Sequence, residues 1–321
     1  MSEQSKAGMA GFDPEFTDLD HYIRVITDRI WEGGRIDDIT RYYSDPCVVE
    51  TPSSVSTALS AVIDGTRATL AQFPDRRLLA EDIIVSGDEV GGYLSSHRII
   101  STMTHLGTGN FGSATQARIH VRTIADCVCR DNRIIHEWLV RDQGAIARQV
   151  GLAPKDLAQR WLDAAGGWHK PQAGPAPHGY HSHLSTDAQA QTYAQALEEQ
   201  AFGRGHAALT YDDAIHQLGP GGQVRYGRDE VQQFWSALFG ALHVTSFVVE
   251  HLALQQGDGR ADRVAIRWRA QAVHSGDGLF GTPSGKSIEL LGINHVEFFR
   301  GKVLREWVLL DEIALWMQVL A

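Results

Sequence analysis

The chain has 321 residues, of which 43% are hydrophobic and 21% charged, and its formal net charge is −10. The length predicts roughly two globular domains, and the acidic balance argues against a nucleic-acid partner, which needs a basic surface. No apolar run reaches the length of a membrane span and the first residues lack a signal-peptide pattern, so we expect a cytoplasmic protein without a membrane partner. Three cysteines, Cys47, Cys127 and Cys129, do not indicate a disulfide framework.

The first half of the chain begins with helical patterns and continues with strand-like ones. Leu19, Ile23, Ile26 and Ile30 recur at helical spacing, which predicts an amphipathic helix that ends at Gly33. We expect a short helix at 36–43, a strand at 47–49 and a third helix at 65–73. Four strand-like runs and a closing helix follow at 83–85, 93–101, 117–129, 134–141 and 145–150. Helices followed by long strands predict an α+β domain in which a sheet folds over helices.

A segment rich in Gly and Pro, 164–184, separates this half from the next and has the composition of a linker. It contains His178, His181 and His183, but their spacing supplies no rigid element for a metal site, and we expect no metal. The second half repeats the plan of the first. Helices are expected at 193–202 and 229–242, and strands at 248–254, 263–273, 287–299 and 303–310.

The two halves end on the same motif. Residues 133–151 and 302–320 share a Glu-Trp pair, an Asp four residues after the Trp, and a later Gln-Val pair, with a constant spacing of 169 residues. His105 and His274 keep the same spacing. A repeat of this length indicates two copies of one domain. We expect domain 1 at 12–163, the linker at 164–184 and domain 2 at 185–321.

The repeated motif gives each copy a candidate proton-transferring residue. Trp138, Val140 and Asp142 alternate along a predicted strand and therefore share one face, as do Trp307 and Asp311 in the second copy. A carboxylate beside a Trp loses hydration, which raises its pKa toward neutrality and makes it a usable acid or base. An Asp just before a helix is also an ordinary N-cap, and both interpretations are left open.

Other polar residues add to the candidate sites. On the neighbouring strand, copy two presents His295 and Glu297, and copy one presents His120, Arg122 and Asp126. With Glu50 and His97, copy one has the more polar set, which favours it as the active copy. Two histidines in Gly-rich loops and two tyrosines on the first helices are further candidates. Surface exposure is the ordinary interpretation of such histidines, and core packing that of such tyrosines. These candidates are His105, His274, Tyr22 and Tyr193.

The run at 274–286, the run at 292–303, and Glu306-Trp307 with Asp311 resemble the SnoaL-like polyketide cyclases of the NTF2-like superfamily. Copy one shows the pattern more loosely, and Phe73-Pro74-Asp75 is similar to the end of the third helix in that family. The resemblance implies two tandem cone-shaped α+β domains, each with a pocket between sheet and helices and with no metal or organic cofactor. It also implies an Asp as general acid and base, at Asp142 and Asp311 by position. Because single-domain relatives commonly pair through the outer faces of their sheets, we expect a covalent pseudo-dimer, and further homo-oligomerisation is left open.

These observations predict a cofactor-independent acid–base enzyme for a small or medium carbonyl or hydroxyl compound. Aldol-type cyclisation, retro-aldol cleavage, isomerisation and dehydration all fit. Asp142 or Asp311 would move the proton, and His105, His274 or a tyrosine would hold the oxyanion. The residues expected to bind substrate are Tyr22, Glu50, His97, His120, Arg122, Asp126, Trp138, Tyr193, His295, Glu297 and Trp307. The alternatives are a non-catalytic binding or interaction protein of the same fold, and hydrolysis by an Asp-Arg-Asp arrangement that would use Arg122 and Asp126.

Overall fold

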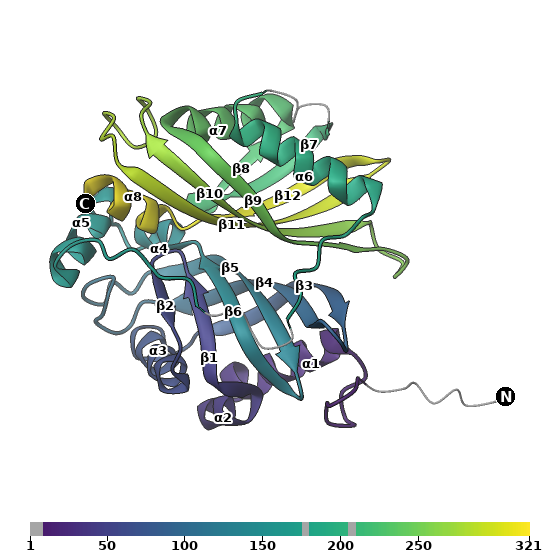
Figure 1. Ribbon diagram of the computed structural model, residues 1–321. Coiled ribbons are helices and arrows are strands. Elements are labelled where there is room, and N and C mark those ends of the chain that lie inside the picture. Colours follow the sequence, from purple (N-terminus) through teal and green to yellow (C-terminus); the bar gives the residue numbers. More distant parts are fainter. Residues whose placement is uncertain (1–8, 175–179, 205–209) are drawn as a thin grey trace.

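The computed structural model describes residues 9–174, 180–204 and 210–321. It contains two six-stranded sheets stacked on each other (Figure 1). The earlier helices of each domain lie on the side of its sheet away from the other sheet, whereas the helices that end each domain lie together at one edge of the stack. No helix in the described part of the chain is long and apolar enough to cross a membrane. The α+β architecture predicted from the sequence is confirmed.

Domain 1 places three α-helices and two short helical segments, the π-helix η1 and the 3-10 helix η2, before most of its strands. Its elements are α1 (Leu19–Thr27), η1 (Asp28–Glu32), η2 (Ile36–Asp38), α2 (Ile39–Tyr42), β1 (Tyr43–Thr51), β2 (Ser54–Ser56), α3 (Leu59–Gln72), β3 (Arg77–Asp88), β4 (Gly92–Thr104), β5 (Arg118–Arg130), β6 (Arg133–Arg141), α4 (Gln143–Gln149) and α5 (Pro154–Ala165). The strand order is β2-β1-β6-β5-β4-β3, with β1 parallel to β6 and the other pairs antiparallel.

Domain 2 repeats this plan. Its elements are α6 (Ala188–Ala201), β7 (Tyr211–Gly219), η4 (Pro220–Gly222), β8 (Gln223–Tyr226), α7 (Gly227–Ala241), β9 (Leu242–Gln255), β10 (Arg263–His274), β11 (Ser287–Phe299), β12 (Lys302–Leu309) and α8 (Glu312–Leu320). The order β8-β7-β12-β11-β10-β9 matches that of domain 1, again with one parallel pair, β7 and β12.

Local sequence signals set the ends of these elements. The carboxylate of Asp18 accepts the backbone N–H of His21 at 2.8 Å and so caps α1. The β5–β6 hairpin turns at Asp131 and Asn132, whose φ angles are 48° and 63°. Both angles suit a tight turn that matches the twist of the strands, and Asp and Asn tolerate this left-handed region better than most residues.

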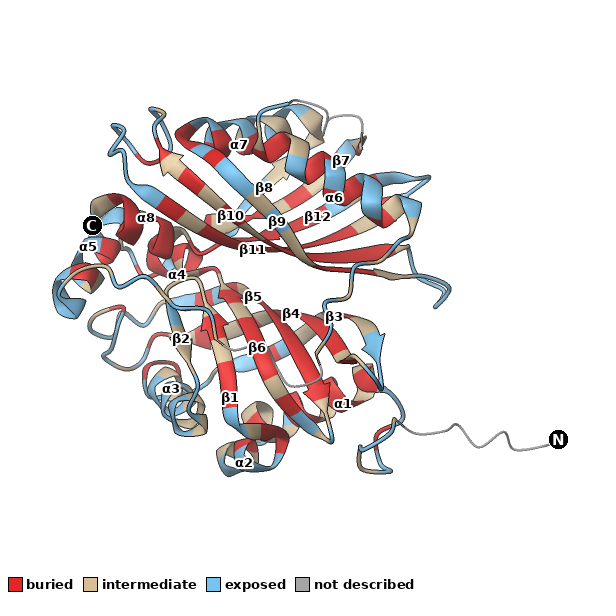
Figure 2. Cartoon of the chain, viewed as in Figure 1, coloured by how far each residue is buried: buried red, intermediate tan, exposed pale blue. Residues whose placement is uncertain are grey.

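Apolar side chains hold the two sheets together. Buried residues lie along the strands of both sheets (Figure 2). One buried cluster joins the sheets face to face, with Ile124 and Val140 from domain 1, and Leu291, Ile293, Trp307 and Leu309 from domain 2. A second, smaller cluster joins Ile84 to Ala253 and Ala265. The predicted pseudo-dimer, in which the outer faces of the sheets pack together, is confirmed.

Two arginines cross this interface in a pseudo-twofold arrangement. The guanidinium of Arg98, in domain 1, lies 3.6 Å from the ring centroid of Trp307 in domain 2. The guanidinium of Arg267, in domain 2, lies 3.5 Å from the ring centroid of Trp138 in domain 1. The two pairs are related by the same spacing of 169 residues as the sequence repeat. Cation–π contacts between desolvated groups contribute up to about 2 kcal/mol each, so both pairs help to fix the relative position of the sheets.

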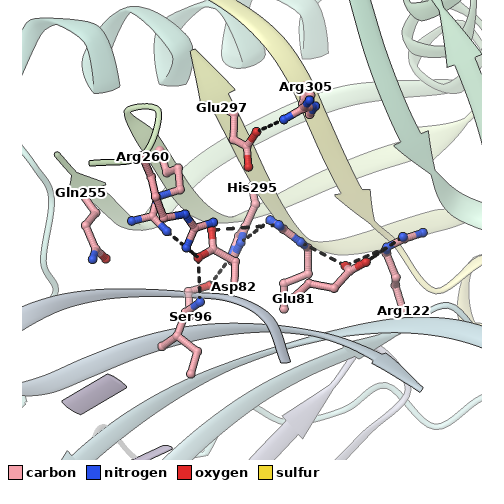
Figure 3. A network of polar contacts seen from close by, with 12 residues as sticks. Glu81, Asp82, Ser96, Arg122, Gln255, Arg260, His295, Glu297 and Arg305 are labelled. Atoms are coloured by element: carbon pink, nitrogen blue, oxygen red, sulfur yellow. Dashed lines mark hydrogen bonds and ion pairs between the residues drawn. The ribbon is translucent and has the colours of Figure 1, made fainter. Parts of the chain in front are cut away.

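Buried polar groups complete the interface. The carboxylate of Asp126 accepts hydrogen bonds from Arg267 Nη1 at 2.9 Å and from His251 Nδ1 at 3.1 Å. Burial raises the pKa of Asp126, but the hydrogen bond from His251 and the charge of Arg267 outweigh it and lower the pKa to about 2. At the position equivalent to Asp126, His295 lies 2.7 Å from Ser96 Oγ, across the boundary between the domains (Figure 3). The interface therefore contains charges that depend on partners in the other domain.

The pair between Arg267 and Asp126 gives a stability prediction. Arg267→Gln leaves the buried Asp126 carboxylate without its cationic partner, which should lower the free energy of unfolding by about 3–5 kcal/mol. The matched control is Arg305→Gln, whose side chain is 53% exposed in its pair with Glu297 and which should change stability by about 0.5 kcal/mol or less. Urea unfolding at neutral pH measures both, and equal losses in the two variants would contradict this account of the interface.

Candidate active site

A cavity of about 430 Å³ lies in domain 1 between the inner face of the sheet and the helices α1 and α3. This volume is within the range of small-molecule sites, about 300–1,000 Å³. Most of the wall is apolar. Ile23 and Ile26 of α1, Val62 of α3, and Ile99 and Leu139 of the sheet contribute to it. Such surfaces would enclose the rings of a ligand, and the polar side chains that make up the rest of the wall would set its orientation.

Glu137 is the one carboxylic acid among the residues that line this cavity. It lies on β6, and strand alternation places Leu139 and Arg141 on the same face. The Tyr43 hydroxyl donates a hydrogen bond to Glu137 Oε2 at 3.2 Å. Burial raises the pKa of Glu137 to about 7, although the hydrogen bond from Tyr43 and the charge of Arg141 lower it. An acid with this pKa exists in both protonation states at neutral pH and can therefore accept and return a proton.

Two further polar residues of the wall lack partners. The Nε2 atom of His97 and the Oγ1 atom of Thr123 are buried and form no hydrogen bond to any described residue. Burial lowers the pKa of His97 to about 3, so its imidazole is neutral at physiological pH. A buried polar atom without a partner destabilises the free protein. A ligand oxygen bonded to either residue would relieve this cost.

Arg76 and Arg141 lie at one end of the same cavity. Arg141 is four residues beyond Glu137 on β6, which separates their backbones by about 13 Å at a strand rise of about 3.3 Å per residue. Burial and the charge of Arg141 lower the pKa of Arg76 to about 9, and burial lowers the pKa of Arg141 as well. With a pKa of about 9, Arg76 remains a cation at neutral pH, and a guanidinium group in general keeps its proton in proteins. The cavity thus contains one acidic group and two positive charges, and Arg141 is near enough to Glu137 to lower the pKa of its carboxyl group.

Domain 2 fills the corresponding space with side chains. At the positions equivalent to Thr66 and Ile99, domain 2 has Trp235 and Trp268, and both indole rings are fully buried in its core. Gly292 makes room for Trp268, because a Cβ atom there would lie 2.3 Å from the indole ring. These substitutions explain why the ligand-sized cavity is found in domain 1.

The carboxylate of domain 2 equivalent to Glu137 is hydrogen-bonded to neighbouring side chains. Glu306 accepts hydrogen bonds from the hydroxyl of Tyr193 at 2.6 Å, the hydroxyl of Tyr211 at 2.9 Å and the amide of Gln217 at 2.7 Å. It therefore has three partners within its own core, whereas Glu137 has one such side-chain partner among the described residues. We place the candidate site in domain 1, the copy favoured by the sequence.

The structure places Asp142 and Asp311 at helix starts. Asp142 accepts the Ala145 N–H of α4 at 2.9 Å, and Asp311 accepts the Ile313 N–H of α8 at 3.0 Å. The N-cap interpretation is confirmed by these bonds. Burial raises the pKa of Asp142 to about 6 and that of Asp311 to about 7. Neither aspartate lines the 430 Å³ cavity.

Asp142 also binds domain 2. It accepts the backbone N–H groups of Gly221 and Gly222, each at 2.9 Å. Both glycines have positive φ angles of 74° and 68°, a conformation that presents two successive N–H groups to one carboxylate and that other residues rarely adopt. Asp142 therefore joins the domains as well as capping α4.

The two loop histidines are buried, which corrects the interpretation of both as exposed residues. His105 Nδ1 lies 3.1 Å from Thr115 Oγ1, and His274 Nδ1 lies 3.0 Å from Ser284 Oγ. Each imidazole thus holds two parts of its own loop together, and neither lines the cavity. Burial lowers the pKa of both.

Of the residues expected to bind substrate, His97 lines the cavity. The others lie elsewhere. Four of them pack between the sheets: Asp126, Trp138, His295 and Trp307. Three bind neighbouring side chains, Glu50 those of His136 and Arg269, Arg122 that of Glu81, and Glu297 that of Arg305. His120 is exposed, the Tyr22 hydroxyl bonds to the Asn132 carbonyl, and the Tyr193 hydroxyl bonds to Glu306.

Sequence reasoning missed Glu137 and Arg141 because it followed the other face of β6. It also missed Tyr43 and Arg76, which lie on β1 and in the connection between α3 and β3. Trp138, Val140 and Asp142 do share a face, as predicted, but that face is covered by domain 2. The sequence signal for the cavity was the other face of the same strand, on which Glu137 and Arg141 flank the apolar Leu139. Among the described residues no group of three His, Cys, Asp or Glu side chains could hold a metal ion, and His178 lies outside the described residues.

Comparison with known proteins identifies relatives. The model of the SnoaL-like polyketide cyclase family matches residues 21–150 and 188–319. No curated protein sequence matches the chain.

Solved structures with a similar fold include IdmH from Streptomyces antibioticus, with 18% identity, a TM-score of 0.37, and coverage of 41% of this chain and 98% of IdmH. TsrD from Streptomyces laurentii has 16% identity, a TM-score of 0.36, and coverage of 41% and 94%. A SnoaL-like polyketide cyclase from Agrobacterium tumefaciens has 21% identity, a TM-score of 0.35, and coverage of 41% and 98%.

The raised pKa of Glu137 predicts a specific dependence of stability on pH. Because the folded-state pKa, about 7, lies above the ordinary value of 4.5, the folded protein binds this proton more tightly than the unfolded chain. The contribution to stability is complete below about pH 4.5 and is lost as the pH rises through 7. The difference in free energy of unfolding between wild type and Glu137→Gln should therefore fall by roughly 3 kcal/mol from acidic to mildly basic pH.

Urea unfolding at a series of pH values measures this difference. Glu89→Gln, at an exposed turn, is the matched control and should show a nearly constant difference from wild type. A constant difference for Glu137→Gln as well would show that its carboxyl group titrates at the same pH in the folded and unfolded chain.

Proposed function

The chain belongs to the SnoaL-like polyketide cyclase family, and we propose that domain 1 is an acid–base enzyme whose substrate is a small or medium-sized carbonyl compound with one or more rings. Glu137 is the proton-transferring residue of this proposal. The observation that carries it is the position of a single buried carboxyl group, with a pKa raised to about 7, in the wall of a ligand-sized apolar cavity. Domain 2 acts as a fixed partner that covers the outer face of the catalytic sheet.

The first chemical step is removal of a proton from carbon. The Glu137 carboxylate takes a proton from the carbon next to a substrate carbonyl, and the electron pair of the broken C–H bond forms an enolate. The buried Nε2 of His97, in the tautomer that carries a proton, or the Thr123 hydroxyl donates a hydrogen bond to the enolate oxygen. Because the apolar wall excludes water, such donors stabilise the developing charge more strongly than they would in solution.

The second step returns the proton. In an aldol cyclisation the enolate carbon attacks another carbonyl of the same molecule, a carbon–carbon bond forms, and the resulting alkoxide receives the proton from Glu137. In an isomerisation the proton returns to a different carbon. The pKa of Glu137 suits both directions of transfer near neutral pH. Formation of the enolate is therefore the shared step and the one to measure.

A non-catalytic binding protein is the second candidate. The apolar part of the cavity wall favours it, because such surfaces bind ring systems without any chemistry. Both functions need the same cavity, and only the enzyme needs the carboxylate of Glu137. Variants of that residue separate the two.

We expect wild-type protein to accelerate exchange of the protons next to the carbonyl of 1-tetralone or 2-tetralone in D2O, followed by proton NMR. Glu137→Gln should lower the catalysed rate by about a hundredfold or more, the usual effect of losing a general acid–base group. The matched control is Glu306→Gln, the same change at the equivalent carboxylate of domain 2, which should keep the rate. Bound tetralone without accelerated exchange would favour the binding protein. Loss of the rate in Asp142→Asn or Asp311→Asn, with Glu137→Gln active, would return the role to the helix caps.

The indole rings of domain 2 suggest a way to close the cavity. Thr66→Trp places in domain 1 the residue that fills domain 2, so binding of 2-acetylnaphthalene, measured by isothermal titration calorimetry, should be lost while the circular dichroism spectrum is retained. Thr192→Trp, on the exposed surface of α6, is the control and should bind normally. Unchanged binding in Thr66→Trp would place the ligand outside this cavity.

A further inference from the structure

We propose that the substrate of domain 1 carries a carboxylate, and that Arg76 and Arg141 bind this carboxylate at one end of the cavity. This inference rests on the proposed function in one respect, the assignment of Glu137 as the residue that reacts with the substrate. It names the class of ligand as a ring-bearing keto acid, and it separates the binding end of the substrate from its reacting end.

The two arginines come from different elements and meet at one place. Arg76 lies in the connection between α3 and β3, and Arg141 is the last residue of β6. Both line the 430 Å³ cavity and also a small extension of about 50 Å³ next to it. Two guanidinium groups on one wall can present several N–H donors to one planar carboxylate.

Neither guanidinium has a protein counterion. Within the described ranges, the side chains of Arg76 and Arg141 form no hydrogen bond or ion pair, and the buried Nε of Arg141 has no partner. Arg98, a buried arginine of domain 1, in contrast binds a carboxylate directly, that of Glu81 at 3.2 Å. Two neighbouring cations without a counterion destabilise the empty cavity, and a bound carboxylate would neutralise part of that charge.

The nearest acidic residues do not fill this role. Glu32 exerts an electrostatic effect on Arg76, and Asp311 and Glu137 exert one on Arg141. Glu32 is bound to the guanidinium of Arg77 and to the backbone N–H of Leu78, and Asp311 caps α8. The carboxylates of Glu32 and Asp311 are therefore committed elsewhere. The carboxylate of Glu137 accepts its hydrogen bond from Tyr43, so among the described residues no carboxylate is bound to the arginine pair.

The backbone spacing along β6 gives an upper limit to the length of the ligand, because the side chains of Glu137 and Arg141 extend into the cavity. Glu137 and Arg141 are about 13 Å apart along the strand, with Leu139 between them on the same face. A flat two-ring compound with a carbonyl group at one end and a carboxylate at the other spans a distance of this order. Domain 2, in which side chains fill the corresponding space, has Leu310 at the position equivalent to Arg141. The arginine is therefore found in the domain whose cavity can hold a ligand.

A matched pair of probes tests the proposal in the full chain. The probes are 6-acetyl-2-naphthoate and its methyl ester, which share the rings and the enolisable acetyl group and differ in charge. By isothermal titration calorimetry near neutral pH, wild type should bind the acid at least about tenfold more tightly than the ester. Arg76→Gln and Arg141→Gln should each remove most of that preference, a change of about 1.4 kcal/mol per factor of ten, and should leave ester binding within about threefold of wild type.

The control variant is Arg133→Gln, at the exposed start of the same strand, which should keep the preference for the acid. Because both cavity substitutions remove an uncompensated charge, the variants should unfold at the same urea concentration as wild type or a higher one, which excludes misfolding as the cause. Equal affinity of wild type for acid and ester, no detectable binding of the acid, or a preference that survives both substitutions would each overturn the proposal.

The same samples separate this proposal from the proposed function. Glu137→Gln should bind the acid with its preference intact and should not exchange the acetyl protons in D2O. A preference for the acid that depends on the arginines, without exchange in wild type, would support a carboxylate-binding site and refute the enzyme. Exchange without any preference for the acid would support the enzyme and refute the carboxylate site.

Discussion

The packing of one sheet against the other is the interaction on which the rest of the structure depends. Arg98 lies on the ring of Trp307 and Arg267 on the ring of Trp138, so each domain places a cation on an aromatic ring of the other. Apolar side chains around these pairs exclude water from them. Cation–π contacts and ion pairs are stronger in such an environment than in water. A single chain thereby achieves the arrangement that two separate subunits would otherwise have to form by association.

This packing decides which residues are free to take part in chemistry. The face of β6 that carries Trp138 is used to join the domains, which leaves the face with Glu137 and Arg141 for the cavity. Domain 2 keeps the interface but has filled its own interior with Trp235 and Trp268. The duplication thus separates two tasks, since one copy retains space for a ligand and the other contributes stability and shape.

The repeat and the alternation of side chains made much of this arrangement predictable. Helices before strands, two equivalent copies and paired outer faces all follow from periodicity and from the resemblance, and the structure agrees. The candidate site was harder, because alternation defines two faces of β6 and does not tell which one another domain covers. Asp142 had the residue type and apolar neighbours of a proton shuttle, yet its carboxylate is bound by backbone N–H groups. Contacts between residues 79 positions apart, as for Asp142 and Gly221, leave no local signal in a sequence.

The central claim is that Glu137 titrates near neutrality inside the cavity of domain 1. Carbon-13 NMR titration of the labelled glutamate carboxyl groups in the full chain, with the Glu137 signal assigned by its absence in Glu137→Gln, measures this pKa directly. The account predicts a value near 7, which a bound carboxylate ligand should raise further by adding negative charge to the cavity. A pKa at or below the ordinary value of about 4.5 would show a permanently ionised, solvated side chain and would contradict the role of Glu137 as the acid and base.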